Sequence, residues 1–322
     1  MILITGAAGF IGSALTAFLN ERGYTELVLV DDFSLPVKRR NWTQKKYRFV
    51  VEREQLFDWV YSYKRDIQAI FHLGARTDTT LREEEPFRQL NLIYSQRLWE
   101  FAVEADVPFF YASSAATYGK GEHGFSDDER LLPSLQPLNP YAASKHAFDV
   151  WAVAQPHKPP RWAGFKFFNV FGPNEYHKGR MASVVWHGFL QIQQEGLIRL
   201  FRSHRPDYQD GEQKRDFVYI KDVVQVLLFF LENTLPSGIY NLGTGQARSF
   251  LDLARALFQS LSLPEKIEFI DTPPSIRESY QYFTQADIHK LRQAGYTQPF
   301  TSLEEGIHDY VQNYLLPVIR TW

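Results

Sequence analysis

The sequence predicts an α/β protein with a doubly wound parallel sheet and a smaller C-terminal lobe. Three observations favour this fold. Short apolar runs rich in β-forming residues recur through the first half of the chain, each is followed by a segment with helical periodicity, and a glycine-rich turn follows the first run. Strands alternating with helices imply βαβ units, right-handed crossovers and a parallel sheet covered on both faces.

The expected elements follow in order along the chain. Strands are expected at residues 1–5, 26–30, 47–51, 69–73, 108–112 and 163–170, with a last strand at 238–245 that returns to the sheet. Polar loops interrupt the pattern after residue 170, and helices are expected near 249–261 and 303–316. We therefore assign the sheet domain to residues 1–170, with 214–245 returning to it, and the lobe mainly to 171–213 and 246–322.

The composition excludes several classes of protein. With 35 Lys+Arg against 37 Asp+Glu, the formal net charge of -2 gives no footprint for nucleic acid or an anionic membrane. The absence of cysteine excludes a disulfide scaffold and thiolate chemistry, and the histidines lack metal-ligand spacing, so no metal site is expected. No apolar run reaches the 18 residues of a membrane helix and the start lacks a signal peptide, so we expect a cytoplasmic protein.

A glycine motif follows the first expected strand directly. Gly6, Gly9 and Gly12 open a helix with GxxGxxG spacing, which lets a pyrophosphate approach the helix N-terminus. Asp31 follows Gly12 by 19 residues, at the end of the second strand, where a carboxylate accepts a hydrogen bond from a ribose hydroxyl. Together these residues predict a dinucleotide site.

The residues after Asp31 leave the choice of dinucleotide open. The charge of Asp31 favours NAD because it repels a 2′-phosphate. Lys38, Arg39, Arg40 and Arg53 follow closely, and a cationic cluster beside the adenosine ribose would hold the extra phosphate of NADP. A solvated basic loop explains the same spacing equally well.

Candidate proton carriers follow the expected fifth strand. Tyr141 and Lys145 lie on one face of a helix that begins at Asn139-Pro140, and an ammonium group beside a phenol lowers the phenol pKa. Ser114 ends the strand, where its hydroxyl is placed to hydrogen-bond a substrate oxygen. The alternatives are a partly buried tyrosine with an exposed lysine, and a capping serine.

Several motifs together resemble a known family. GAAGFIG, YASSAATYG, YAASK, FNVFGP, KRDFVY and NLGTG resemble the extended short-chain dehydrogenase/reductases that act on nucleotide sugars. HKGRMASVVWH, FTQAD and SSAATYG resemble, more narrowly, the epimerases of ADP-heptose. The resemblance implies a Rossmann fold, bound NADP, a small-molecule partner and inversion of C6 of the heptose through a transient ketone. It also implies a homo-oligomer, with a pentamer among the allowed states; UDP-hexose 4-epimerisation remains the alternative.

The resemblance assigns roles to particular residues. Ser114 becomes the hydroxyl partner, Tyr141 and Lys178 the two acid/base groups, and Lys145 the residue that tunes Tyr141 and contacts the nicotinamide ribose. The implied cofactor contacts are Gly6, Gly9, Phe10, Ile11, Gly12, Asp31, Asp32, Lys38, Arg53, Leu73, Gly74, Ala75, Arg76, Thr77, Asn91, Lys145, Val170 and Lys178. The implied substrate contacts are Ser114, Asn169, Arg180, His187, Phe201, Arg202, Ser203, His204, Arg215 and Tyr280.

The need for two proton carriers follows from the chemistry of inversion. In the two epimers the hydroxyl points to different sides of the pocket, so one fixed phenol does not serve both positions if the sugar stays anchored. Taken without the resemblance, Lys178 is more simply a residue of a solvated basic loop. A dinucleotide-fold protein without catalysis is a further alternative, which the presence of Ser114, Tyr141 and Lys145 opposes.

Overall fold

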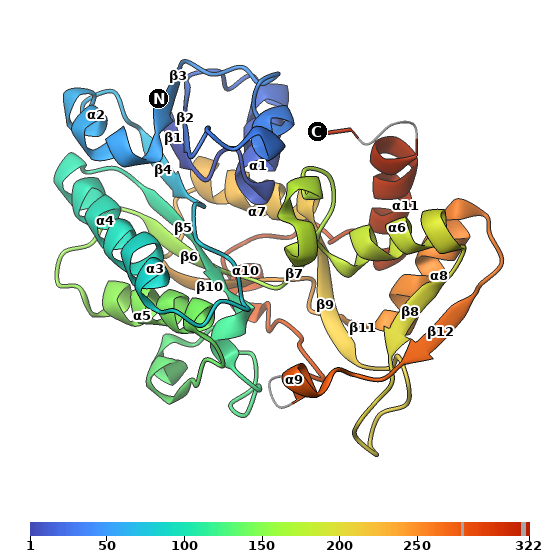
Figure 1. Cartoon of the computed structure of the whole chain (residues 1–322). Coiled ribbons are helices and arrows are strands. Elements are labelled where there is room, and N and C mark those ends of the chain that lie inside the picture. The colour runs from blue at the N-terminus through green and yellow to red at the C-terminus, as the bar shows by residue number, and fades with distance from the viewer. Residues whose placement is uncertain (278–279, 317–319) are drawn as a thin grey trace.

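The computed structural model describes residues 1–277, 280–316 and 320–322, and its centre is a seven-stranded sheet (Figure 1). The strand order is β10-β6-β5-β4-β1-β2-β3, and each printed pairing within this sheet is parallel. The strands are β1 (Ile2–Thr5), β2 (Leu27–Asp31), β3 (Phe49–Glu52), β4 (Ala69–His72), β5 (Phe109–Ser114), β6 (Trp162–Phe167) and β10 (Gly238–Leu242). The predicted doubly wound fold is confirmed.

Helices cover both faces of this sheet because side chains alternate along each strand. Ile2 and Ile4 of β1 join one apolar core with α1 and α7, whereas Leu3 joins a second core with α2, α4 and α5. Both faces are buried, which explains why the central strands are continuous apolar runs. The helices are α1 (Phe10–Glu21), α2 (Leu56–Ser62), α3 (Glu85–Phe87), α4 (Tyr94–Ala105), α5 (Pro140–Ala154), α6 (Val184–Glu195), α7 (Ile220–Glu232), α8 (Phe250–Leu261), α9 (Pro274–Arg277), α10 (His289–Gln293) and α11 (Leu303–Tyr310).

A smaller lobe packs beside the carboxyl ends of the sheet strands (Figure 1). It contains the sheet β11-β9-β7 and the pair β12-β8, whose strands are β7 (Asn169–Phe171), β8 (Ile198–Phe201), β9 (Lys214–Tyr219), β11 (Ala247–Ser249) and β12 (Ile267–Ile270). Helices α6, α8 and α11 complete it, and their apolar side chains join the core that also contains α1 and α7. The two parts therefore share one continuous core.

The chain crosses between the two parts differently from the predicted boundaries. The strand expected at 163–170 is divided after Phe167, because β6 stays in the main sheet while β7 joins the small one. Within the segment 214–245, β9 lies in the small sheet and pairs in parallel with β7. Only α7 and β10 return to the main sheet. Within the described part of the chain, no helix is both long and apolar enough to cross a membrane.

Candidate active site

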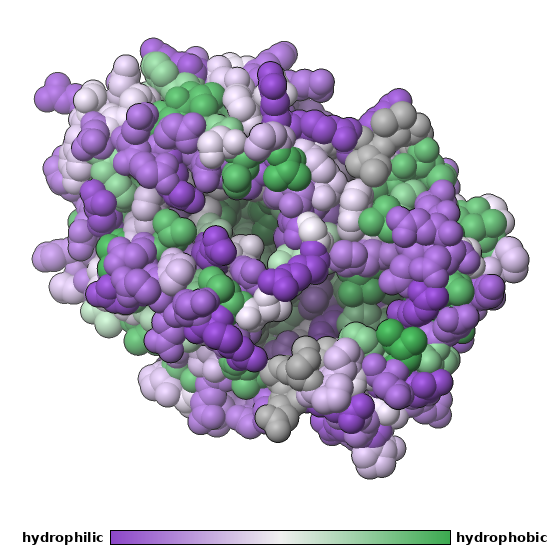
Figure 2. Space-filling model, viewed as in Figure 1, coloured by the Kyte–Doolittle hydropathy of each residue, from purple (hydrophilic) through white to green (hydrophobic). Residues whose placement is uncertain are grey.

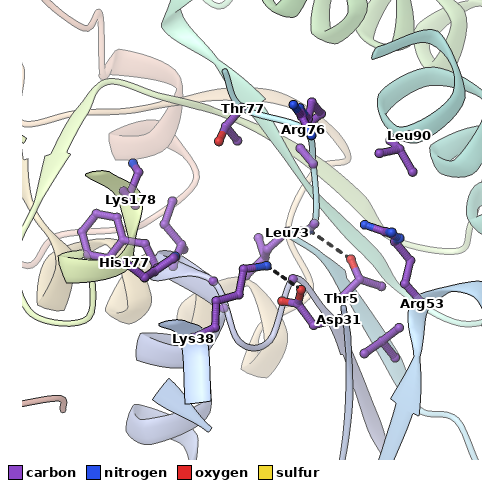
Figure 3. Close-up of a pocket in the computed structure, with 18 of the residues that line it drawn as sticks. Thr5, Asp31, Lys38, Arg53, Leu73, Arg76, Thr77, Leu90, His177 and Lys178 are labelled. Atoms are coloured by element: carbon purple, nitrogen blue, oxygen red, sulfur yellow. Dashed lines mark hydrogen bonds and ion pairs between the residues drawn. The ribbon is translucent and has the colours of Figure 1, made fainter. Parts of the chain in front are cut away.

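A cavity of about 440 Å³ opens at the carboxyl ends of the first strands, the usual ligand position in an open α/β sheet. The surface in Figure 2 is hollowed between the main sheet and the lobe. Figure 3 shows His177 and Lys178 on one side of the cavity and Arg53 and Leu90 on the other. The residues that line it are Thr5, Gly6, Gly9, Phe10, Ile11, Gly12, Val30, Asp31, Lys38, Arg53, His72, Leu73, Gly74, Ala75, Arg76, Thr77, Asp78, Leu90, Tyr94, His177, Lys178, Arg180 and Met181.

The glycine motif forms a tight turn into α1 that only glycine permits. A Cβ on Gly12 would lie 2.2 Å from the carbonyl oxygen of Gly6, and one on Gly6, whose φ is +68°, would lie 2.6 Å from the nitrogen of Gly74. Gly9 caps α1 without a side chain. The N–H groups of the first turn therefore face the cavity end of the helix without intrahelical acceptors, which fits the pyrophosphate of a dinucleotide.

Asp31 ends β2 with its carboxylate fully engaged by protein donors. It accepts hydrogen bonds from the nitrogen of Ala8 at 2.9 Å and from Lys38 Nζ at 2.9 Å. The contact with Lys38 is drawn in Figure 3. Arg53 lines the same cavity, and its guanidinium group also pairs with Glu54. Asp32, in contrast, is outside the lining and accepts hydrogen bonds from Ser34, which lower its pKa. The cavity edge at the end of β2 thus carries two cations beside one neutralised carboxylate.

Asn91 holds the loop that follows β4, and this loop lines the cavity. Its side chain has no exposed surface. It accepts a hydrogen bond from the nitrogen of Arg76 at 2.8 Å, and donates to the oxygen of Arg76 at 3.0 Å and to Ser144 Oγ at 2.9 Å. Asn91 thus supports the loop, and its direct contact with a cofactor stays a prediction. The loop is also held where the nitrogen of Gly74 donates to Thr5 Oγ1 at 3.1 Å.

Ser114, Tyr141 and Lys145 meet where β5 ends beside the start of α5. Asn139 caps α5, since its side chain accepts from the nitrogen of Ala142 at 2.9 Å. The Ser114 hydroxyl is hydrogen-bonded to the Tyr141 phenol. Lys145 is buried, and its Nζ donates to the carbonyl oxygen of Ala112 at 2.8 Å. The strand end and the first two turns of the helix therefore form one compact group.

The pKa of Tyr141 is raised in the structure, whereas the lysine neighbour predicts a lowered value. Burial raises the pKa of Tyr141, and the hydrogen bond with Ser114 only partly opposes this effect. Burial also lowers the pKa of Lys145 to about 8, against the charge of Asp149. The reason is that a dry site disfavours the charged form of either group. Tyr141 is thus held in its protonated form.

Lys178 does not belong to β5 or α5. It lies on the short 3-10 segment Tyr176–Met181, which connects β7 to α6. Its Nζ is 5.2 Å from the centre of the Phe10 ring, and it lines the cavity. Burial lowers the pKa of Lys178, while the charge of Glu175 raises it. Arg180, expected as a substrate contact, lines the same cavity and pairs with Asp78 at 3.0 Å. The basic segment is therefore part of the cavity wall.

A second group of predicted residues gathers in the lobe. The ring of Tyr280 lies 6.1 Å from that of Phe201 and 6.2 Å from that of His204, and the buried Arg215 guanidinium is 5.4 Å from the Tyr280 ring. Ser203 and His204 both contact the hydroxyl of Tyr282, which sequence reasoning missed. Arg202 is exposed and pairs with Asp271 at 3.2 Å. These residues form an aromatic surface with cations at its edge.

The predicted residues thus divide into groups. The cavity lining includes Lys178 but not Ser114, Tyr141 or Lys145, and the lobe group lies outside it. Further predicted contacts also lie outside the lining: Asp32, Asn91, Asn169, Val170 and His187. Sequence reasoning missed the lining residues Thr5, Val30, His72, Asp78, Leu90, Tyr94, His177 and Met181. Thr5 and His72 end β1 and β4, so the strand ends were the signal that could have revealed them.

Among the described residues, no group of three or more His, Cys, Asp or Glu side chains is placed to hold a metal ion.

Comparisons with known proteins extend this picture. The NAD dependent epimerase/dehydratase family matches residues 2–243. A protein of Fusobacterium nucleatum subsp. nucleatum named ADP-L-glycero-D-manno-heptose-6-epimerase is 45% identical over 325 residues, which cover 98% of each chain. One of the same name from Nitratidesulfovibrio vulgaris (strain DP4) is 46% identical over 317 residues, again covering 98% of each chain.

Solved structures of epimerases are also similar to this chain. The Helicobacter pylori ADP-L-glycero-D-manno-heptose-6-epimerase has a TM-score of 0.82 and 30% identity, covering 96% of this chain and 94% of its own. A UDP-N-acetylglucosamine 4-epimerase from Methanobrevibacter ruminantium also reaches 0.82 at 22% identity, covering 96% of each chain, and shows the fold alone. From the extent of these matches, the chain belongs to the NAD dependent epimerase/dehydratase family and, within it, to the ADP-L-glycero-D-manno-heptose-6-epimerases.

Proposed function

We propose that the protein inverts C6 of the heptose of ADP-D-glycero-D-manno-heptose and gives ADP-L-glycero-D-manno-heptose through a transient ketone. The observation that carries this proposal is the position of Lys178 in the wall of the dinucleotide cavity, on a different element from the Ser114–Tyr141–Lys145 group. Two relatives named ADP-L-glycero-D-manno-heptose-6-epimerase, which are 45% and 46% identical over nearly the whole chain, support the proposal.

The glycine turn and the end of β2 would hold a nicotinamide dinucleotide, which supplies a reversible hydride acceptor. When C6 loses hydride, one protein base takes the proton from the C6 hydroxyl. The ketone then presents its other face, C6 regains the hydride, and the second protein acid protonates the oxygen. The Ser114 hydroxyl would donate a hydrogen bond to that oxygen as charge develops. No proton or electron is gained or lost overall.

Burial shifts the pKa values of the two carriers in opposite directions. Burial raises the pKa of Tyr141 and so favours the phenol as a proton donor, whereas burial lowers the pKa of Lys178 and so favours the amine as an acceptor. After one turnover the roles are exchanged, as reversal of the inversion requires. A 4-epimerase that turns its sugar over a single tyrosine has no need of Lys178.

NADP is the dinucleotide that the cavity edge supports best. The charge of Asp31, which would repel a 2′-phosphate, is neutralised by Lys38 at 2.9 Å. Arg53 adds a second cation in the same lining. A guanidinium and an ammonium group together favour a phosphate at this edge. Cofactor released from freshly purified protein and identified by mass spectrometry should be NADP, and NAD as the sole species would refute this assignment.

The lobe group is suited to the nucleotide diphosphate of the substrate. Tyr280 and Phe201 offer ring faces for a purine, and Arg215 offers a fork of donors for diphosphate oxygens. We assign the substrate-binding lobe mainly to residues 171–213 and 246–322, together with the small-sheet strands β7 and β9. A homo-oligomer and a cytoplasmic location belong to the same proposal, supported by the family resemblance and by a chain without cysteine.

The test is direct. Purified protein is mixed with either epimer of ADP-heptose, without added oxidant or reductant, and the C6 configuration is followed by proton NMR. Both epimers should approach the same equilibrium mixture. UDP-galactose and UDP-glucose are tested in parallel. Interconversion of the UDP-hexoses without change in ADP-heptose would replace the proposal with the 4-epimerase alternative.

A further inference from the structure

Glu175 is a fully buried carboxylate placed between β7 and the segment that carries Lys178. One of its oxygens accepts hydrogen bonds from the nitrogen of Gly172 at 3.2 Å and from Ser183 Oγ at 2.7 Å. The other accepts from the nitrogen of Ser183 at 2.6 Å. Because Gly172 and Ser183 lie on opposite sides of this segment, the carboxylate ties both of its ends together.

The hydrogen bonds fit an ionised Glu175. Two of its partners are backbone N–H groups, which only donate. Ser183 Oγ already accepts from the nitrogen of Trp186 at 3.2 Å, so its proton is directed to Glu175. The hydroxyl of Tyr310, from α11, is also hydrogen-bonded to Glu175. Burial raises the pKa of Glu175, while Ser183 and the charge of Lys178 oppose that effect.

The backbone links Glu175 to Lys178 directly. The nitrogen of Lys178 donates to the carbonyl oxygen of Glu175 at 2.9 Å, which closes one 3-10 turn. Gly179 then takes a left-handed conformation, with a φ of 54°, that ends this turn. The position of the Lys178 side chain over Phe10 thus depends on the turn that Glu175 anchors.

Glu175 also acts on Lys178 through its charge, which raises the lysine pKa. Four other charged side chains of the cavity wall form ion pairs with each other. Asp31 pairs with Lys38 and Asp78 pairs with Arg180. Further lining groups with a charge or a titratable proton are His72, Arg53, Arg76, Tyr94 and His177. Burial, with the charges of Lys38 and Lys178, lowers the pKa of His177 to about 4, which keeps this neighbour neutral.

We propose that Glu175 is the positioning residue of Lys178: its buried charge and its bonds to Gly172 and Ser183 hold the lysine in the cavity wall and set the pH at which it exchanges its proton. This inference rests on the proposed epimerase function, in which Lys178 is an acid/base group. Glu175 itself touches no reacting atom.

The test measures the proton affinity of Lys178 without relying on catalysis. Wild type and Glu175→Gln are labelled with trace acetic anhydride between pH 6 and 11, and mass spectrometry follows acetylation of the Lys178 peptide. Removal of one negative charge favours the neutral amine, so the midpoint should move to lower pH, by about one unit. In the epimerase assay kcat should fall at least about tenfold with little change in KM.

Two further variants separate this role from simple loss of structure. Asp222 is a matched control on α7: it accepts from the nitrogen and hydroxyl of Thr301, both at 2.8 Å, and its pKa is also raised by burial. Asp222→Asn should leave the Lys178 midpoint unchanged. Glu175→Asp keeps the charge and should restore the midpoint toward wild type, and it serves as the test if the glutamine variant does not fold.

An unchanged Lys178 midpoint in Glu175→Gln, or an equal shift in Asp222→Asn, would overturn the inference. These outcomes are distinct from a failure of the proposed function. If Lys178→Met epimerises at the wild-type rate, the two-base reaction fails, but the labelling midpoint still reports whether Glu175 controls the lysine.

Discussion

At the scale of single residues, the site depends on groups whose proton affinities are moved in opposite directions. Tyr141 has a raised pKa, whereas Lys178 and Lys145 have lowered values, and burial is the first cause in each case. Burial therefore makes the largest change to these pKa values, and individual charges oppose it, as the charge of Glu175 does at Lys178. In each case burial favours the neutral form of the group, which for Tyr141 is a phenol and for Lys178 an amine.

The two proton carriers should be equally necessary for inversion. Tyr141→Phe and Lys178→Met should each lower epimerisation about a hundredfold or more, the usual contribution of a positioned acid/base group, while bound cofactor is retained. Each variant is also assayed for dismutation of the 6-aldehyde analogue, which needs only one carrier and should persist in at least one of them. A Lys178→Met protein with near wild-type epimerisation would disprove the two-base reaction.

Arg215 should contribute to substrate binding more than to cofactor binding. Arg215→Ala should weaken the free energy of substrate binding by about 1.5 to 3 kcal/mol, the range for charge-assisted hydrogen bonds, and so raise the dissociation constant. Isothermal titration with ADP, against Arg255→Ala as an exposed control from the same lobe, measures this difference. Because Arg215 is buried and donates to the carbonyl oxygen of Lys214 at 2.9 Å, cofactor content is measured as well. Equal loss of cofactor would indicate a folding role.

At the scale of elements, the strand ends of the main sheet are held by polar side chains under the cavity. Thr5 Oγ1 and His72 Nδ1 are 2.7 Å apart, and His72 Nε2 lies 2.8 Å from Ser95 Oγ. These contacts connect β1, β4 and α4. Burial, with the charge of Lys145, lowers the pKa of His72 to about 3. The neutral ring is therefore part of the folded sheet edge.

This histidine should make the fold sensitive to acid. His72 takes up a proton near pH 6.5 in the unfolded chain but only near pH 3 in the folded chain. The stabilisation that depends on neutral His72 is therefore complete above pH 6.5 and is lost as the pH falls toward 3. The free energy of unfolding should fall by up to about 1.4 kcal/mol per pH unit within this window. Urea denaturation at pH 7, 6 and 5 should give a flatter profile for His72→Gln, and parallel profiles would contradict the prediction.

At the scale of the whole molecule, one core runs from the main sheet into the lobe, and the candidate site lies along their boundary. A buried ion pair reinforces the sheet side of this boundary. Lys166 Nζ of β6 lies 2.8 Å from Asp149 of α5, and both side chains are almost fully buried. Tyr111 and Ser113 of β5 also donate to Asp149, at 3.0 and 2.7 Å. One carboxylate thus joins three elements next to Ser114.

Loss of either partner should destabilise the whole fold. Asp149→Asn would leave the Lys166 charge buried without compensation, so the free energy of unfolding should fall by about 3 to 5 kcal/mol. Urea denaturation measures this change, and Asp128→Asn, which breaks the pair between the partly exposed Asp128 and the exposed Arg130, should have a much smaller effect. The combined change Asp149→Leu with Lys166→Met should recover most of the stability, and failure to do so would argue against desolvation as the cause.

The sequence by itself determined the fold class, the glycine turn and the family motifs, because strand and helix periodicity and the steric needs of glycine are local properties. Tertiary structure alone decided what each polar group contacts. It divided the strand at 163–170 between two sheets, enclosed Asn91 beneath a loop, paired Asp31 with Lys38 and raised the pKa of Tyr141. Burial and pairing depend on residues distant along the chain, so no local pattern encodes them.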